Sequence, residues 1–388
     1  MNTVRLVPLI SLVLLACAMV GVVAADFTTP ESIVAADKVY VSGVTYNPAV
    51  FFPGDKGTLT VDVTNGNNGT GVNINHATLS SDSIKSTGNP YDSSSSLGPG
   101  QKQSFVFSVI ADGVDGTYYP TFSFSFRDAD SLFYRAVVKI DETPLVLTIL
   151  DKPDTFSQGK KKTIYAQVAN PRENTVKNVI LDVSGTGITT SPSRVFVGSV
   201  ASGATVPVNF TVTAEQPTTL NLLLNYDNGD NPHSVNMEIP IAFGVDKKQA
   251  NPVISNVQVK SDAGTYHITG DVNNAGLETA NTVMVAALSP AVPQDPYKTY
   301  VVGALKPDDF GSFEVTFAAT DAATIPLQLS YKDADGNVYN SVQDVKISAY
   351  NATTQKSTGL PMIPIVAVIV ILALFIGGWV VYLKKYKQ

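Results

Sequence analysis

The chain has 388 residues, a net charge of −7 and only 15% charged residues. This mildly acidic, sparsely charged composition argues against nucleic acid as a partner, because nucleic acid binding needs a basic face. Cys17 is the only cysteine, which excludes a disulfide framework within the chain and a cysteine-based metal site. The histidines, His76, His233 and His267, lie far apart, and the chain lacks the zinc-protease, hydrolase and phosphate-loop motifs, so we expect no enzymatic activity.

Residues 1–25 have the pattern of a secretory signal peptide. Arg5 supplies a short positive region, residues 6–23 are apolar, and small residues precede a predicted cleavage after Ala25. Two alternatives are an uncleaved N-terminal anchor and lipidation at Cys17, although the apolar run continues past that cysteine. Export predicts that the following domains are extracellular.

Three copies of one unit follow, with a period near 105 residues. In each copy a glycine opens an alternating strand and an asparagine closes it ten or eleven residues later: Gly54 and Asn65, Gly159 and Asn170, Gly264 and Asn274. A turn then leads into a second alternating strand, whose equivalent inward positions are Phe107, Phe210 and Val315. A hairpin with a tip rich in Asp, Asn and Gly completes each copy.

Several short alternating strands per copy, separated by frequent turns, are typical of an antiparallel β-sandwich. We therefore expect an all-β protein with three tandem Ig-like sandwich domains, at residues 38–142, 143–245 and 251–348. The links between the copies are short and polar, and each ends in proline, which predicts limited bending.

A polar stalk at 349–360 leads to a predicted transmembrane helix at 361–383 and a basic tail at 384–388. Residues 363–383 carry no charge and, at ~1.5 Å per residue, are long enough to cross a hydrocarbon core of ~30 Å. The lysines of the tail predict a cytoplasmic C-terminus, and flanking aromatic residues suit the membrane interface. The predicted anchor residues are Trp379, Tyr382, Lys384, Lys385 and Lys387. The alternative is that a sorting enzyme replaces this helix with a lipid.

The hairpin tips at 128–130, 227–231 and 333–337 cluster oxygen side chains, which are the ligands that Ca²⁺ prefers. The last tip, with Asp333, Asp335 and Asn337, resembles half of an EF-hand loop. However, its glycine, Gly336, stands at position four rather than six, and strands flank the loop. Ordinary turn chemistry is the favoured interpretation, calcium is the weak alternative, and we expect no other cofactor.

Asn68, Asn209 and Asn351 match the N-glycosylation pattern, at a frequency close to chance. Because Phe210 is expected to point inward, Asn209 should point to solvent.

An alternating aromatic run in the first copy contains Phe122, Phe124 and Phe126, which we interpret as core residues rather than a sugar platform. Phe51 and Phe52, beside Pro53, are better candidates for ligand contact, because they fall at an expected domain end.

The repeated glycine–strand–asparagine and turn–strand signatures resemble Ig-like modules of the CARDB (cell-adhesion-related) and NPCBM-associated types. Arrays of such modules between a signal peptide and a C-terminal helix are similar to archaeal S-layer-domain surface proteins. The match is best at residues 52–70 and 97–109 and weakest in the third copy, where Lys306-Pro307-Asp308-Asp309 replaces the usual Pro-Gly turn. The resemblance implies a fold but supplies no active-site residues.

These features predict a non-enzymatic, single-pass protein of the cell membrane. Its sandwich domains would act as a spacer and as an interaction surface for envelope proteins or glycans, within or beneath a surface layer. The alternative is an extracellular accessory subunit of a membrane transport or export complex.

Overall fold

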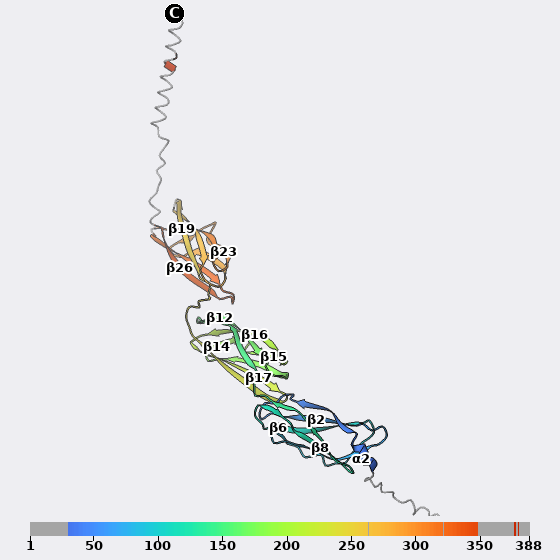
Figure 1. The fold of residues 1–388 in the computed structure, drawn as a ribbon. Coiled ribbons are helices and arrows are strands. Elements are labelled where there is room, and N and C mark those ends of the chain that lie inside the picture. Colours follow the sequence, from blue (N-terminus) through green and yellow to red (C-terminus); the bar gives the residue numbers. More distant parts are fainter. Residues whose placement is uncertain (1–29, 263, 321, 348–375, 378, 380–388) are drawn as a thin grey trace, which may run out of the picture. The chain divides into compact units, whose positions relative to one another are not determined.

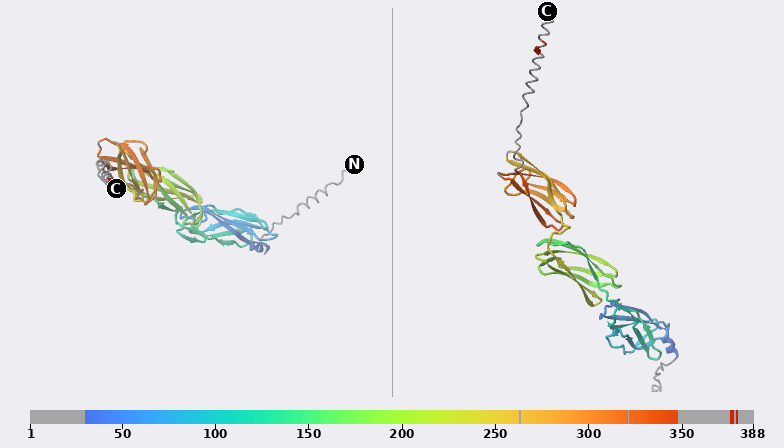
Figure 2. Two further views of the ribbon diagram at one scale, coloured as in Figure 1. Left: turned by 90° about the horizontal axis from the view of Figure 1, so that it is seen from above. Right: turned by 60° about the vertical axis from the view of Figure 1, so that its left-hand side comes forward.

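The computed structural model describes residues 30–262, 264–320, 322–347, 376–377 and 379. These residues form an all-β fold with a short N-terminal helix, α2 (Pro30–Ala36), and seven antiparallel sheets (Figures 1 and 2). The predicted signal peptide with Ala25, the glycosylation candidate Asn351, and Tyr382, Lys384, Lys385 and Lys387 lie outside the described residues.

Six of the sheets have four strands, and they form three pairs, each enclosing its own cluster of buried hydrophobic side chains. We call these pairs the first, second and third sandwich. The described residues up to Gly244 make one compact unit that holds the first two sandwiches, and those from Val245 make a second unit that holds the third. The expected all-β class and repeated sandwiches are confirmed, and the three domain boundaries stay predictions.

The first sandwich pairs a sheet of order β1-β2-β6-β4 with one of order β5-β3-β8-β9, and β7 and β10 form a small two-stranded sheet. Its strands are β1 (Val39–Asn47), β2 (Lys56–Asn65), β3 (Val72–Ser80), β4 (Ile84–Ser86), β5 (Ser95–Leu97), β6 (Lys102–Ala111), β7 (Gly116–Tyr118), β8 (Thr121–Phe126), β9 (Leu132–Arg135) and β10 (Val138–Ile140).

The second sandwich pairs β11-β12-β16-β14 with β15-β13-β17-β18. Its strands are β11 (Val146–Asp151), β12 (Lys161–Ala169), β13 (Val176–Ser184), β14 (Ile188–Ser191), β15 (Arg194–Val200), β16 (Thr205–Ala214), β17 (Thr218–Asn228) and β18 (Asn231–Ile241).

The third sandwich repeats this order, with β19-β20-β24-β22 against β23-β21-β25-β26. Its strands are β19 (Pro252–Asp262), β20 (Thr265–Asn274), β21 (Ala280–Ala287), β22 (Val292–Pro293), β23 (Thr299–Leu305), β24 (Phe310–Ala318), β25 (Thr324–Lys332) and β26 (Val338–Lys346).

Period-two alternation explains why these segments are strands with one buried face. On β2, Leu59, Val61 and Val63 have no exposed surface, while Thr60 and Asp62 between them are half-buried. The predicted equivalence of Phe107, Phe210 and Val315 is confirmed, because they pair with Leu59, Ile164 and Ile268 at the same register of the three sandwiches. All three are buried, as are Phe122, Phe124 and Phe126 of the aromatic run.

The asparagine that closes each repeat is more than a turn residue. Asn65, Asn170 and Asn274 are buried, and each side-chain amide donates to carbonyl oxygens of two separate loops, for example Asn274 to Glu278 and Leu305. Each side-chain carbonyl accepts the backbone N–H two residues later. We call this unit the asparagine corner. A buried amide with every group paired cross-links loops that the strands alone leave separate.

Near the C-terminus the structure describes only Ile376, Gly377 and Trp379, which are helical, with the Trp379 side chain exposed. Over the described part of the chain, none of the helices combines the length and apolarity that crossing a bilayer requires. Nearly all of the predicted span at 361–383 falls outside the described residues, so the anchor stays a prediction.

Candidate functional site

Arg172 forms the centre of the joint between the first two sandwiches. It lies two residues after the corner Asn170, whose side chain accepts the Arg172 backbone N–H. The side chain has no exposed surface. Its Nη1 donates to the carbonyl oxygens of Asp141 (2.6 Å) and Thr143 (2.9 Å), on the connection between the sandwiches. Its Nη2 lies 3.3 Å from the carbonyl oxygen of Val50 in the first sandwich.

The Arg172 guanidinium also lies over the ring of Phe52, 3.6 Å from its centroid, which is a close cation–π contact. Burial lowers the pKa of Arg172, and the nearby Asp141 carboxylate opposes that shift. Because arginine stays protonated in proteins, the joint holds a positive charge surrounded by carbonyl oxygens and an aromatic face.

A second part of the joint is a buried polar network around Asn228, at the tip of the β17–β18 hairpin. The Asn228 amide donates to the Asp55 carboxylate (2.6 Å) and to the Val50 carbonyl (2.9 Å), and its own carbonyl accepts from Asn174. His233 contacts the other Asp55 oxygen at 2.8 Å, and its ring lies 4.0 Å from that of Phe52. These contacts tie the second sandwich to the 50–55 loop of the first.

This geometry corrects one expectation and refines another. Phe51 and Phe52 are not exposed ligand candidates: they are 0% and 6% exposed. Phe52 leaves the first sandwich and packs in the hydrophobic cluster of the second, because the joint buries both sides of the loop. The tip at 227–231 is a docking element as well as a turn, since Asn231 exchanges two hydrogen bonds with the backbone of Lys56.

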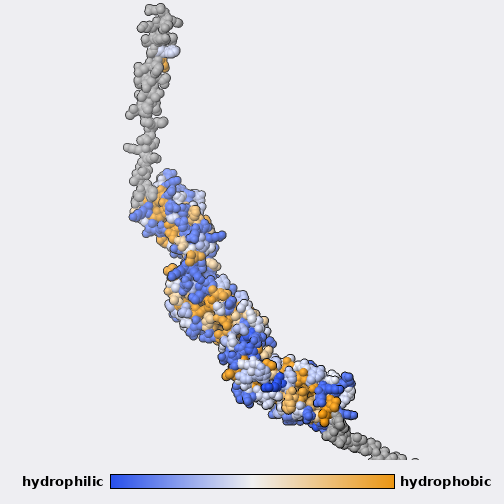
Figure 3. Space-filling view, in the orientation of Figure 1, coloured by the Kyte–Doolittle hydropathy of each residue, from blue (hydrophilic) through white to orange (hydrophobic). Residues whose placement is uncertain are grey.

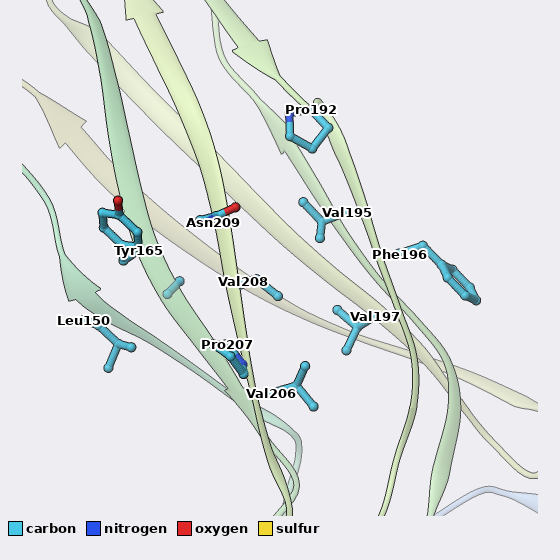
Figure 4. A pocket seen from close by; sticks show the side chains of 11 residues that line it. Leu150, Tyr165, Pro192, Val195, Phe196, Val197, Val206, Pro207, Val208 and Asn209 are labelled. Atoms are coloured by element: carbon cyan, nitrogen blue, oxygen red, sulfur yellow. The ribbon is translucent and has the colours of Figure 1, made fainter. Parts of the chain in front are cut away.

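The second sandwich has an apolar hollow of about 430 Å³ between β15 and β16. In Figure 4, Val195 and Val197 on one side and Val206 and Val208 on the other point into this space, while Phe196 points away. Further lining residues are Leu150, Tyr165, Ala166, Pro192, Pro207 and Asn209.

The rim of this hollow is unusually apolar for a surface. Phe196 is 72% exposed, Leu150 56% and Tyr165 48%. On the face drawn in Figure 3, apolar surface interrupts the polar surface of the sandwiches. Single exposed apolar residues are common on proteins, whereas here several of them gather around one hollow.

A more polar hollow of about 370 Å³ occupies the corresponding place in the third sandwich. Tyr297 and Tyr300 line it, with ring centroids 5.8 Å apart. Asp271, also in the lining, accepts hydrogen bonds from Asn256 and Ser312, and these lower its pKa. The carboxylate is therefore already engaged within the sandwich.

The calcium candidates do not form a cage among the described residues, where no three His, Cys, Asp or Glu side chains come together as metal ligands. The Asp333 carboxylate is buried and accepts from the Asn337 backbone, the Asn337 amide and the Tyr339 hydroxyl. Burial and the neighbouring Asp333 raise the pKa of Tyr339. The carboxylate thus serves the turn, which agrees with the favoured interpretation of this tip.

Two of the glycosylation candidates are described. Asn68 is exposed in the loop after β2, and Asn209 is exposed on β16 with Tyr165 opposite it on β12. The expected orientation is confirmed, because Phe210 is buried between Asn209 and Thr211. Thr211 Oγ1 donates to the Ser191 carbonyl oxygen. Glycan attachment stays a prediction.

Sequence reasoning missed both the joint and the hollow. The available signal for Arg172 was its place two residues after a repeated asparagine, where the other copies have Asn67 and Gly276. The signal for the hollow was small residues at Ala166 and Val208, at positions where the first copy has larger ones.

Comparison with known proteins adds little about activity. No family model matches the chain. An uncharacterized protein of Methanocaldococcus jannaschii is 27% identical over 208 residues, which is 52% of this chain and 39% of that protein. This chain therefore spans about two fifths of the curated relative it matches. The crystal structure of red sea bream transglutaminase shares 15% identity over 52% of this chain and 31% of that one, with a TM-score of 0.22, a likeness too low to carry an argument.

Proposed function

We propose that this protein is a non-enzymatic cell-surface protein, held by a single C-terminal membrane helix, whose Ig-like sandwiches act as a spacer and as an interaction surface within or beneath a surface layer. The charge-free segment at 363–383 and the lysines after it support the anchor. The resemblance to archaeal surface modules supports the setting.

The observation that carries the spacer role is the Arg172 joint. A flexible tether between domains needs few contacts, whereas this joint buries a charged side chain, an asparagine–aspartate pair and Phe52. Such contacts make sense where two sandwiches must transmit position as one body. The hollow between β15 and β16 supports the interaction role.

Cleavage on intact cells tests the proposal. A site for a sequence-specific protease is inserted between Gln355 and Lys356, in the predicted stalk, and the protease is added to cells that express the chain. We expect the sandwiches to appear in the medium while a C-terminal tag stays with the membrane. The same protease on detergent-solubilised protein is the control. Efficient cleavage after solubilisation with none on intact cells would refute the orientation.

A further inference from the structure

The three sandwiches can be compared position by position, because their strands pair in the same register. Val61 and Phe105 in the first sandwich correspond to Ala166 and Val208 in the second and to Gly270 and Phe313 in the third. Across the sandwich, the residues that face this point are Tyr91, Val195 and Tyr300, which pair with Ala77, Leu181 and Val285.

In the first sandwich Tyr91 fills this space. Its ring meets Phe105 and Phe107 edge-on, with centroids 5.3 and 5.6 Å apart. Its hydroxyl accepts from the backbone N–H of Val106 (3.0 Å) and donates to the carbonyl oxygen of the same residue (2.8 Å). The chain therefore shows how a tyrosine occupies this position: the ring packs on the core and the hydroxyl pairs with the outward backbone of β6.

In the second sandwich the same space is open, because each contributing residue is smaller. Val195 replaces the tyrosine, and Ala166 and Val208 replace Val61 and Phe105. The result is the hollow of about 430 Å³. In the third sandwich Tyr300 and Phe313 are aromatic again, but Gly270 stands in place of Val61, and the more polar hollow of about 370 Å³ remains beside them. The first sandwich is therefore the one that shows how a tyrosine occupies this position.

The backbone at the hollow is also available. The residue that corresponds to Val106 is Asn209. Strand β14 pairs with β16 only as far as Ser191 and Thr211. Asn209 is the next β16 residue whose backbone N–H and C=O point toward the β14 side, and it lies beyond the end of β14. Pro207, the following outward-facing residue, has no N–H to pair, which is typical of a free sheet edge. Among the described residues no side chain pairs with the Asn209 backbone as Tyr91 pairs with that of Val106.

We propose that the hollow of the second sandwich receives a tyrosine side chain from an extended segment of a protein partner. The ring enters between Val195 and Val208, and the hydroxyl pairs with the Asn209 N–H and C=O. The flanking partner backbone continues the line of β14 and covers Phe196 on the neighbouring edge strand β15. Tyr91 of the first sandwich indicates that the side chain in the hollow is a tyrosine, and the exposed apolar residues around the hollow provide the surface that the partner buries.

This inference deepens the proposed interaction role, on which it rests for its biological setting, but it is tested without a membrane. The probe is a synthetic peptide of residues 88–97, which carries Tyr91 in its own sequence context, labelled with a fluorophore. The control peptide has Tyr91→Ala. Fluorescence anisotropy with the purified full-length chain should show binding at least tenfold weaker for the control peptide.

Two variants of the chain test the location. Val195→Tyr places a tyrosine where the first sandwich has Tyr91 and should weaken peptide binding at least tenfold while raising the thermal midpoint by a few degrees. Ala166→Val, which matches Val61, narrows the hollow and should weaken binding without relying on a new aromatic ring. Phe133→Ala, at an exposed residue of the first sandwich, is the matched control and should leave binding unchanged.

Equal binding of the tyrosine and alanine peptides would overturn the proposal, as would unchanged binding to both hollow variants. Binding that appears only after enzymatic removal of a glycan from Asn209 would assign the hollow to the chain's own sugar and would also overturn it. Each of these outcomes is independent of cleavage on intact cells, so failure here leaves the anchored spacer standing.

Discussion

Replacing Arg172 with alanine should uncouple the first two sandwiches. The guanidinium is buried, donates to the carbonyl oxygens of Asp141 and Thr143, and lies over Phe52. These partners belong to the connection and to the first sandwich, while Arg172 itself belongs to the second. One side chain therefore contacts the connection and the first sandwich together, beside the Asn228 network and the Asn231–Lys56 hydrogen bonds.

The expected magnitude follows from these contacts. The two shorter hydrogen bonds have a charged donor and contribute about 1.5–3 kcal/mol each, and a desolvated cation–π contact adds about 2 kcal/mol. Dehydration of the guanidinium opposes them by several kcal/mol. Alanine relieves that cost but leaves the carbonyl oxygens without their donor. We expect a net loss of about 3–5 kcal/mol, which lowers the melting temperature by roughly 6–20 °C for two sandwiches that unfold together.

Differential scanning calorimetry of the full-length chain measures this effect. The unaltered protein should show one transition for the first two sandwiches, and Arg172→Ala should show an earlier transition that separates into two. Arg194→Ala is the matched control, because Arg194 is in the same sandwich but its side chain is 68% exposed and pairs only with Asp182. If both variants melt alike, the joint does not couple the sandwiches and the spacer argument fails.

Four further predictions concern single residues. Asn170→Ala should lower the free energy of unfolding by about 3 kcal/mol in urea titrations, because the carbonyl oxygens of Asn174 and Val200 lose their donor. If the loss is no larger than that of Asn236→Ala, at an exposed position, the asparagine corner does not stabilise the sandwich. Asp308→Gly should stabilise the third sandwich by about 0.5–1 kcal/mol, because Asp308 has φ 62° where the second sandwich has Gly203 at φ 68°. Gly203→Asp should destabilise the second sandwich by a similar amount. If neither variant shifts the urea midpoint of unfolding, the positive φ does not strain Asp308. Hydrogen bonds from Lys102 and Ser104 hold the pKa of Asp62 below its ordinary value. The Asp62 carboxylate therefore stabilises the fold above about pH 4, and this stabilisation is lost as the pH falls through the lowered folded-state pKa. Asp62→Asn should reduce the loss of stability at acid pH, and an unchanged acid limb of the pH–stability curve would contradict this. Calorimetric titration with Ca²⁺ should give no binding heat, because the turn engages the Asp333 carboxylate; heat that vanishes in Asp335→Asn would reverse that conclusion.

The strands were predictable because they depend on local alternation. Residues such as Leu59, Val61 and Val63 appear at every second position, and their burial follows whichever sandwich topology forms. The joint was not predictable in this way. Arginine in a loop is usually exposed. Arg172 is buried by partners that lie 31 and 122 positions away in the sequence, so no local pattern predicts its burial. The hollow exists because the residues around it have small side chains, and a small side chain is no signal in a single sequence. Only the strand register of all three sandwiches reveals that Val195 stands where Tyr91 and Tyr300 do.

The asparagine corner explains how one repeat unit accommodates different neighbours. In each sandwich the corner asparagine accepts the backbone N–H two residues later, and that residue meets the chain that enters the sandwich. Asn67 donates to the Ala35 carbonyl of α2, Arg172 donates to Asp141 and Thr143, and a Cβ at Gly276 would lie 2.3 Å from the Gln249 carbonyl oxygen. The corner asparagine is the same in all three sandwiches, and the residue two positions later sets the contact. It is an amide that meets a short helix in the first sandwich and a cation at the joint in the second. In the third it is a glycine, because the entering chain at Gln249 lies too close for a side chain. Exchange of Arg172 and Gly276 should therefore damage both sandwiches, since an arginine has no room at 276 and a glycine leaves the joint without its cation.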